Sequence, residues 1–208
     1  MKLVALISGR GSNLRAILDA GIAVTAVMSN NPAAAGLALA QARDIPTGVV
    51  DHRDYASRAE FDRVMQTAID AYAPDLVVLA GYMRILTDDF VHHYAGRLMN
   101  IHPSLLPSFP GLQTHARALA EGVKIHGCTV HFVTPSLDRG PVVIQAAVPV
   151  LAQDTAETLQ RRVLAAEHRI YPQAVRWFLE GRLYIDSSGR VNLFEGTASE
   201  QSVLMTGV

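Results

Sequence analysis

The chain has 208 residues, of which 50% are hydrophobic and 18% charged, and its formal net charge is −1. This length fits one large domain, because single cores grow to about 250 residues before chains divide. A charge near zero gives no electrostatic reason to expect nucleic acid or an anionic membrane as a partner. The apolar runs are shorter than the roughly 20 residues that a bilayer span needs. We therefore expect a cytoplasmic protein with small-molecule partners.

Strand-like and helix-like segments alternate through the first hundred residues. Segments with helical periodicity separate short apolar runs, and one of these runs, 75–81, is continuously apolar, as a strand buried on both faces must be. The predicted strands are 2–8, 22–29, 47–50, 75–81 and 96–102, and the predicted helices are 12–21, the segment after Pro32, 57–73 and 88–94. This alternation is typical of a parallel sheet with helical crossovers.

The second half predicts a different order of elements. A helix over 114–122 precedes two strands, 126–134 and 141–150, joined by 135–140. Asp154 and Glu157 have the spacing of a capping box for a long helix through about Leu179, and 182–194 resembles a closing hairpin. The predicted fold class is α/β: an open, mostly parallel, twisted, Rossmann-like sheet with mixed C-terminal strands, flanked by helices. We expect a catalytic domain over 1–183, and a hairpin with a disordered tail over 184–208.

The turn "SGRGSN" (8–13) follows the first strand and opens a helix. Its backbone N–H groups and the helix dipole can bind a phosphate. For this motif alone, a phosphate site and an ordinary glycine-rich turn without a ligand have roughly equal odds. Leu14 replaces the third glycine of a dinucleotide fingerprint, and there is no Walker lysine. A phosphate monoester therefore fits this turn better than NAD or ATP.

The stretch "NIHPSLLPSFPG" (100–111) ends another predicted parallel strand. Strand alternation puts Asn100 and His102 on one face, at the edge where open α/β sheets bind ligands. An amide donor and an imidazole suit an oxygen that gains negative charge in a transition state, and three prolines limit the freedom of the loop. The alternative is an ordinary turn with a surface histidine.

Two acidic residues and one apolar loop have both a structural and a functional interpretation. Asp138, between two strands, is either solvated or placed beside His102 to keep the imidazole protonated. Glu167 lies at the edge of the apolar stripe of the last helix, where periodicity alone favours a rim carboxylate that reaches water. The segment "GYMRIL" (81–86) is either core or an apolar slot for a flat heteroaromatic ring. Cys128 is more typical of a small core residue, and no histidine or cysteine spacing supports a metal site.

Together these stretches resemble the phosphoribosylglycinamide formyltransferases, a family of folate-dependent enzymes of purine biosynthesis. The resemblance covers residues 1 to about 183. It rests on "LISGRGSNL", "YAPDLVVLAGYMRIL", "HYAGRLMNIHPSLLPSFPGL", "HGCTVHFVT", "LDRGPVVIQAAVPV" and "EHRIYP". "NIHPSLLP" with "LDxGP" is similar to the wider group of formyltetrahydrofolate-using enzymes. "GRGSN" narrows the resemblance to the enzymes that act on glycinamide ribonucleotide. The chain has Gln113 at a position where some relatives are expected to have histidine.

The resemblance implies a role for each matching position. The implied catalytic trio is Asn100, His102 and Asp138. The implied substrate contacts are Gly11, Ser12 and Asn13 at the phosphate and Glu167 at the glycinamide end. The implied folate contacts are Arg58 at the glutamate tail, Met83, Arg84, Ile85 and Leu86 with the segment from Thr134 to Asp138 at the pterin, and Asn100.

The implied activity is transfer of the formyl group of 10-formyltetrahydrofolate, a co-substrate, to the amine of 5'-phosphoribosylglycinamide, with no metal. The alternative is a formyltetrahydrofolate hydrolase with the same three polar groups, which we disfavour because relatives of that type carry an extra N-terminal regulatory domain. A nonenzymatic nucleotide-phosphate sensor would not need the trio. Methionyl-tRNA formylation would call for a second, basic domain. A homodimer is a possible assembly.

Overall fold

The computed structural model describes residues 1–196 and 200–205 and divides into two compact units, Met1–Asn100 and Ile101–Val208. The division falls inside the segment 1–183 that the sequence assigns to one catalytic domain, so that assignment stays a prediction. We describe each unit by itself.

The first unit is built on a sheet of parallel strands in the order β5-β4-β1-β2-β3. The five side chains of β1 and the four of β4 are buried, as the continuous apolar runs predict. The strands are β1 (Leu3–Ile7), β2 (Ala26–Ser29), β3 (Thr47–Val49), β4 (Leu76–Leu79) and β5 (Leu98–His102). The helices are α1 (Ser12–Asp19), α2 (Ala35–Gln41), α3 (Arg58–Asp70) and α4 (Asp88–His93), with a 3₁₀ turn at His52–Asp54.

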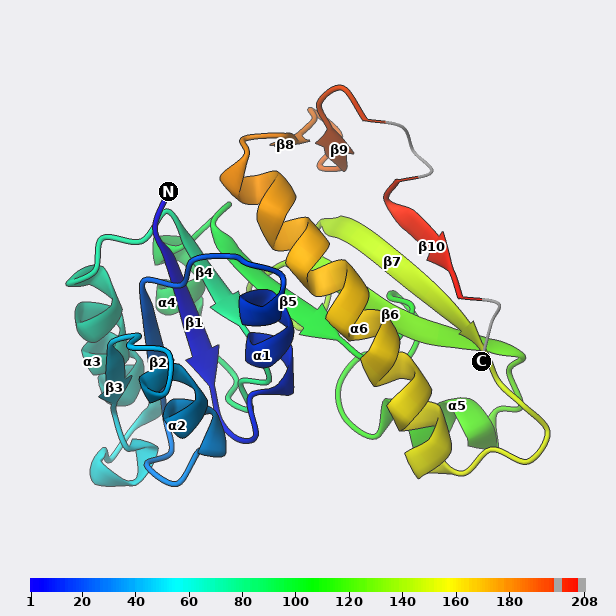
Figure 1. Ribbon diagram of the computed structural model, residues 1–208, viewed down its shortest axis with the longest axis horizontal. Helices are drawn as coiled ribbons and strands as arrows, with labels where there is room; N and C mark the ends of the chain where they lie inside the picture. Colours follow the sequence, from blue (N-terminus) through cyan, green and yellow to red (C-terminus); the bar gives the residue numbers. More distant parts are fainter. Residues whose placement is uncertain (197–199, 206–208) are drawn as a thin grey trace. The chain divides into compact units, whose positions relative to one another are not determined.

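The order of the strands creates a switch point beside β1. The chain runs from β1 outward to β2 and β3, and then returns to β4 on the other side of β1. Right-handed crossovers therefore put α1 and α2 on one face and α3 and α4 on the other, and the helices contact one another in these pairs (Figure 1). The carboxyl ends of β1 and β4 border the switch point, which is where open α/β sheets bind ligands.

The second unit combines an antiparallel pair of strands with a long helix. Strands β6 (Ile125–Phe132) and β7 (Val142–Pro149) are antiparallel, with a register shift between Val130 and His131. Helix α6 (Ala156–Leu179) packs on both strands and contacts α5 (Thr114–Ala120) (Figure 1). Parallel strands early in the chain and mixed strands later confirm the predicted fold class.

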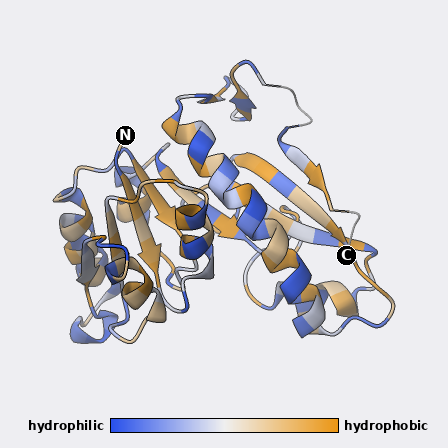
Figure 2. Cartoon of the chain, viewed as in Figure 1, coloured by the Kyte–Doolittle hydropathy of each residue, from blue (hydrophilic) through white to orange (hydrophobic). Residues whose placement is uncertain are grey.

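Helix α6 has an apolar side and a polar side, visible as alternating colours along it in Figure 2. Its capping box differs from the predicted one. Thr155 is the N-cap and exchanges hydrogen bonds with Thr158. Asp154 precedes the N-cap, and its carboxylate accepts hydrogen bonds from the Arg162 guanidinium at 2.7 and 2.9 Å and from the Thr158 hydroxyl at 2.8 Å. None of the helices in 1–196 and 200–205 is long and apolar enough to cross a membrane.

The C-terminal segment contains the predicted hairpin. Strands β8 (Leu183–Ile185) and β9 (Val191–Leu193) pair antiparallel, and Gly189 in their turn has a φ of 79°, which glycine adopts without steric cost. The tail was expected to be disordered, but Ser202–Leu204 forms strand β10, which pairs parallel with β7. The rest of that expectation, for 197–199 and 206–208, lies outside the described residues.

Candidate active site

The glycine-rich turn opens α1 as the sequence predicts. Gly11 is the N-cap with a φ of 72°, and the helix begins at Ser12. No side chain caps this helix and its first turn has no acidic residue, so its N–H groups and the positive end of its dipole are available to an anion. Asn13, in the first turn, is buried with 6% of its surface exposed. The turn therefore has the backbone chemistry of a phosphate site.

Gly36, on α2, packs against this turn. It was not identified from the sequence as part of the site. Its N–H donates a 3.0 Å hydrogen bond to the carbonyl of Gly9. A Cβ added to Gly36 would lie 3.1 Å from Gly11 Cα and 2.7 Å from Ile7 Cδ1. The sequence signal that could have identified Gly36 is a glycine within an alanine-rich helical segment, because alanine is the better helix former.

The loop after β4 lies beside the same turn. The N–H of Ser8 donates to the carbonyl of Gly81 at 3.1 Å, and the N–H of Met83 donates to Ser8 Oγ at 2.8 Å. Met83 is 74% exposed and Ile85 58% exposed. Arg84 and Leu86 are half-buried. The interpretation of Met83 and Leu86 as core is therefore wrong for Met83, while Leu86 is partly covered.

Strand β5 carries both polar residues of the "NIH" motif. Asn100 is half-buried and pairs in register with Leu79, the last residue of β4, so it lies at the carboxyl edge of the sheet in the first unit. His102 ends the strand and is 6% exposed. The alternative of a surface histidine is therefore wrong.

His102 is held between two oxygen acceptors of the second unit. Its Nε2 lies 3.0 Å from the carbonyl oxygen of Phe109, and its Nδ1 lies 3.5 Å from Asp138 Oδ2. The side chains of His102 and Asp138 are each only 8% exposed. An imidazolium, which has two N–H donors, satisfies both acceptors, whereas neutral imidazole can donate to only one.

Asp138 is oriented by the loop that it meets. Its Oδ2 accepts a 2.8 Å hydrogen bond from the N–H of Gly111, and its backbone has a φ of 53°, a left-handed conformation that aspartate tolerates better than most residues. The other carboxylate oxygen, Oδ1, lies 3.9 Å from His131 Nε2. The interpretation of Asp138 as a merely solvated turn residue is therefore wrong.

His131 is a second buried histidine at this carboxylate, and sequence reasoning did not include it. Its side chain is 2% exposed, and its Nδ1 lies 2.9 Å from the Phe132 carbonyl oxygen. Burial lowers the pKa of His131, while the Phe132 carbonyl and Asp138 act in the opposite direction. This histidine lies at the register shift of β6 between Val130 and His131, where the regular alternation of side chains is interrupted.

Phe109, whose carbonyl oxygen lies beside His102 Nε2, has a ring that contacts two other side chains. Its ring lies edge-on to His126, with centroids 5.7 Å apart, and the Arg117 guanidinium lies 5.6 Å from its centroid. Arg117 also donates a 2.6 Å hydrogen bond to the Pro110 carbonyl. The proline-rich loop is thus held by packing as well as by its prolines.

The remaining predicted residues lie as follows. Arg58 is exposed and is the first residue of α3. Thr134 is half-buried and its hydroxyl donates to the Ser136 carbonyl at 3.3 Å.

Glu167 is 7% exposed, so the expectation of a rim carboxylate reaching water is wrong. Gln113 is exposed and is the N-cap of α5, with a left-handed backbone conformation. No group of three or more His, Cys, Asp or Glu within 1–196 and 200–205 is arranged to hold a metal ion.

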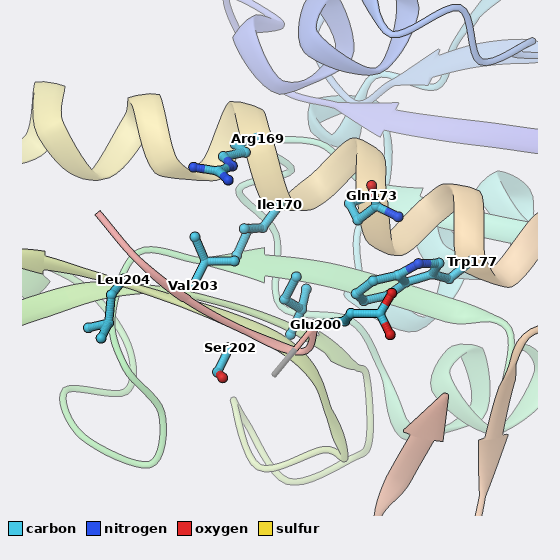
Figure 3. A pocket seen from close by; sticks show the side chains of 9 residues that line it. Arg169, Ile170, Gln173, Trp177, Glu200, Ser202, Val203 and Leu204 are labelled. Atoms are coloured by element: carbon cyan, nitrogen blue, oxygen red, sulfur yellow. The ribbon is translucent and has the colours of Figure 1, made fainter. Parts of the chain in front are cut away.

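A separate hollow in the second unit has a volume of about 440 Å³ and lies between α6 and β10 (Figure 3). Arg169, Gln173 and Trp177 line it from the helix side, and Glu200 and Ser202–Leu204 from the tail. None of the residues that line it is one of the predicted site residues. This hollow is therefore not the predicted site.

The chain is similar to known formyl transferases. The family model described as formyl transferase matches residues 1–175. The phosphoribosylglycinamide formyltransferase of Escherichia coli (strain K12) is 52% identical over 88% of this chain and 89% of its own. The human trifunctional purine biosynthetic protein adenosine-3 is 43% identical over 91% of this chain, which corresponds to 19% of that protein.

The solved structures give the same result. A phosphoribosylglycinamide formyltransferase from Coxiella burnetii has a TM-score of 0.90 and 47% identity, with 99% of both chains covered. A formyltetrahydrofolate deformylase from Pseudomonas syringae pv. tomato has a TM-score of 0.85 but only 28% identity, with 93% of this chain and 66% of that chain covered. The fold is therefore shared more widely than the sequence. The match to the family model and the extent of identity show that this chain belongs to the formyl transferase family, among the phosphoribosylglycinamide formyltransferases.

Proposed function

We propose that this chain transfers the formyl group of 10-formyltetrahydrofolate to the primary amine of 5'-phosphoribosylglycinamide, in purine biosynthesis. The family membership supports the reaction class. The observation that carries the chemistry is the buried imidazole of His102, which lies between the Phe109 carbonyl and the Asp138 carboxylate. A protonated imidazole at this position can stabilise negative charge on a carbonyl oxygen.

The reaction needs no protein nucleophile. The amine nitrogen attacks the formyl carbon to form a tetrahedral intermediate, whose oxygen carries the negative charge. The bond from that carbon to N10 of the folate then breaks, N10 gains a proton, and the attacking nitrogen loses one. The products are the formylated glycinamide ribonucleotide and tetrahydrofolate. The role of the protein is to position the two substrates and to stabilise the charge on the oxygen.

Asn100 and His102 are the proposed donors to this oxygen. The Asn100 amide supplies a neutral N–H. His102 Nε2 donates to the oxygen in place of the Phe109 carbonyl and relays a proton toward N10, while Nδ1 stays beside Asp138. Asp138 holds the charged imidazole and orders a water that carries protons. The left-handed backbone of Asp138 and its hydrogen bond from Gly111 keep the carboxylate on the Nδ1 side of the ring.

The binding roles follow the matching motifs. We assign the phosphate of the substrate to Gly11, Ser12 and Asn13, where an uncapped helix terminus favours an anion. Glu167, a buried carboxylate, is assigned to the glycinamide end. The remaining assignments concern the folate. They are Arg58 at its glutamate tail, and Met83 to Leu86, Thr134, Asp138 and Asn100 at its pterin end.

An absorbance assay of folate deformylation tests the proposal against the hydrolase. The transferase consumes 10-formyltetrahydrofolate only when the ribonucleotide amine is present, and formyl groups appear on that amine in equal amount. A hydrolase instead releases formate without the amine, and this outcome would overturn the proposal. The matched control omits the protein. A cytoplasmic location, the absence of a metal and a possible homodimer stay predictions.

A further inference from the structure

The loop between β4 and α4 is held at both ends by side chains from other elements of the first unit. Near its start, the N–H of Met83 donates to Ser8 Oγ at 2.8 Å. At its end, the N–H of Thr87 donates to Asp62 Oδ2 at 2.7 Å. Ser8 follows β1 and Asp62 lies on α3, so two elements distant in sequence fix one short loop.

Ser8, the first residue of the glycine-rich turn, links this loop to the residues that follow β2. Its hydroxyl accepts from Met83 and donates to Asn30 Oδ1 at 2.6 Å. Its carbonyl accepts from Asn31 Nδ2 at 3.3 Å. A hydroxyl that both donates and accepts has a defined orientation, so Met83 N–H has a fixed partner rather than a freely rotating one.

Asp62 is an unusual anchor because it is an acidic residue with only 2% of its surface exposed. A buried carboxylate is costly unless it accepts hydrogen bonds or faces a positive charge. The Asp62 carboxylate accepts a hydrogen bond from the Thr87 N–H. Burial, and then the negative charge of Asp62, raise the pKa of the Tyr82 phenol, whereas Arg84 acts in the opposite direction. The Arg84 guanidinium lies 5.5 Å from the centroid of Phe61, also on α3.

Between the two anchors the loop presents apolar side chains outward. Met83 and Ile85 are 74% and 58% exposed, although exposing large apolar groups gains nothing in the free protein. Arg58, assigned to the folate tail, lies four residues before Asp62, and positions i and i+4 share a helix face. The helix that fixes the loop therefore also presents the cation proposed for the other end of the same ligand.

We infer that Ser8 and Asp62 are positioning residues for the folate co-substrate: they fix the backbone of the 83–86 loop in the shape that receives the pterin ring. The inference rests on the proposed folate role of this loop. Neither residue is assigned a contact with the ligand. Each acts through a backbone N–H of the loop, so its removal should weaken folate binding while the ribonucleotide still binds to the glycine-rich turn.

The test is the affinity of the whole chain for tetrahydrofolate, measured by titration calorimetry, together with KM for each substrate. Removing one hydrogen bond of ordinary strength predicts a rise of about 3- to 10-fold in the Kd for tetrahydrofolate in Ser8→Ala. We expect the KM for phosphoribosylglycinamide to change less than twofold. Ser8→Thr, which keeps the hydroxyl, should restore affinity. Ser188→Ala, which removes a hydroxyl hydrogen bond in the turn between β8 and β9, is the matched control.

The second anchor gives an independent measurement. Asp62→Asn keeps an oxygen that can accept from Thr87 and should lose less affinity than Asp62→Ala. Ser8→Cys, which preserves volume but is a weak acceptor, replaces Ser8→Ala if the alanine variant does not fold. Unchanged tetrahydrofolate affinity in folded Ser8 and Asp62 variants would overturn the inference, as would an equal loss for both substrates.

Ile85→Ala separates this inference from the proposed function. If Ile85→Ala weakens tetrahydrofolate binding but the anchor variants do not, the loop binds folate and the anchors are dispensable. If Ile85→Ala and Met83→Ala also leave affinity unchanged, the assignment of the loop to folate is wrong, and the positioning role is overturned with it. Loss of affinity in both sets supports the inference.

Discussion

The two units present different kinds of binding chemistry. In the first unit, the glycine-rich turn offers backbone N–H groups at an uncapped helix terminus, and Gly11 and Gly36 make room for them. In the second, buried ionisable side chains lie together: the imidazoles of His102 and His131 are 3.5 and 3.9 Å from the Asp138 carboxylate. The first kind of site is damaged by adding atoms, and the second by removing a functional group or its charge.

The largest expected effect is the loss of His102. Because removal of one oxyanion donor commonly costs 10² to 10³ in turnover, we expect His102→Ala to lower kcat by about that factor. The change should leave the fold and phosphoribosylglycinamide binding intact, with a modest fall in melting temperature because two buried acceptors lose their partner. Steady-state kinetics and thermal denaturation measure both. His92→Ala, at an exposed histidine of α4, is the control. A His102→Ala variant with the parent kcat would refute the catalytic assignment.

Asp138→Asn tests charge with the shape retained. The asparagine oxygen can still accept from the Gly111 N–H, so the loop should stay in place. The variant cannot stabilise an imidazolium as a carboxylate does, and we expect kcat to fall by about 10², the lower range for a group that supports acid–base catalysis. KM for phosphoribosylglycinamide should change little, and any rise in the folate KM should be smaller than the fall in kcat. A variant that loses folate affinity but keeps kcat would indicate a binding role alone.

Much of this contrast could be predicted from the sequence. Continuous apolar runs located β1 and β4, and their alternation with helices predicted the parallel order. Glycines after a strand located the turn, and the strand predicted over 96–102 is β5. These inferences succeeded because they depend on local periodicity and on a general property of parallel sheets.

The features that the sequence missed depend on contacts between distant segments. Asp154 has the spacing of a cap, but Arg162 two turns further along binds its carboxylate, and Thr155 caps the helix. Glu167 lies at the edge of an apolar stripe, and periodicity cannot show that neighbouring elements cover that edge. Gly36 supports a turn that lies 25 residues earlier, which only the packing of α2 reveals. Strand β10 depends on the free edge of β7.

Gly36→Ala tests whether a site made of backbone groups is sensitive to one added methyl group. The new Cβ would meet Ile7 Cδ1 at 2.7 Å and Gly11 Cα at 3.1 Å, and such overpacking commonly costs about 1–3 kcal/mol. We expect it to displace the turn and to raise KM for phosphoribosylglycinamide about tenfold, with a smaller effect on the folate KM. Ala38→Gly changes the stability of the same helix without adding bulk and is the control. An unchanged KM in Gly36→Ala would show that the turn tolerates displacement.

The smallest expected effect is on stability, and it concerns acid sensitivity of the second unit. Burial lowers the pKa of His126 to about 4, with a further contribution from His115. The unfolded chain, with a histidine pKa near 6.5, then binds more protons than the folded chain between about pH 4 and 6.5. Stability therefore falls as pH decreases through this window, and the loss from His126 is about 1 kcal/mol between pH 6.5 and 5.5.

His126→Gln removes this titration and should flatten the acid limb. Urea denaturation at pH 7.5 and pH 5.5 measures the difference in unfolding free energy between the parent and the variant. The variant is expected to be less stable than the parent at pH 7.5, because packing against Phe109 is lost, and that deficit should shrink by about 1 kcal/mol at pH 5.5. A deficit that does not change with pH would show that His126 is protonated equally in both states. Any acid sensitivity of the second unit would then have to come from other histidines, such as His115 and His131, whose pKa desolvation also lowers.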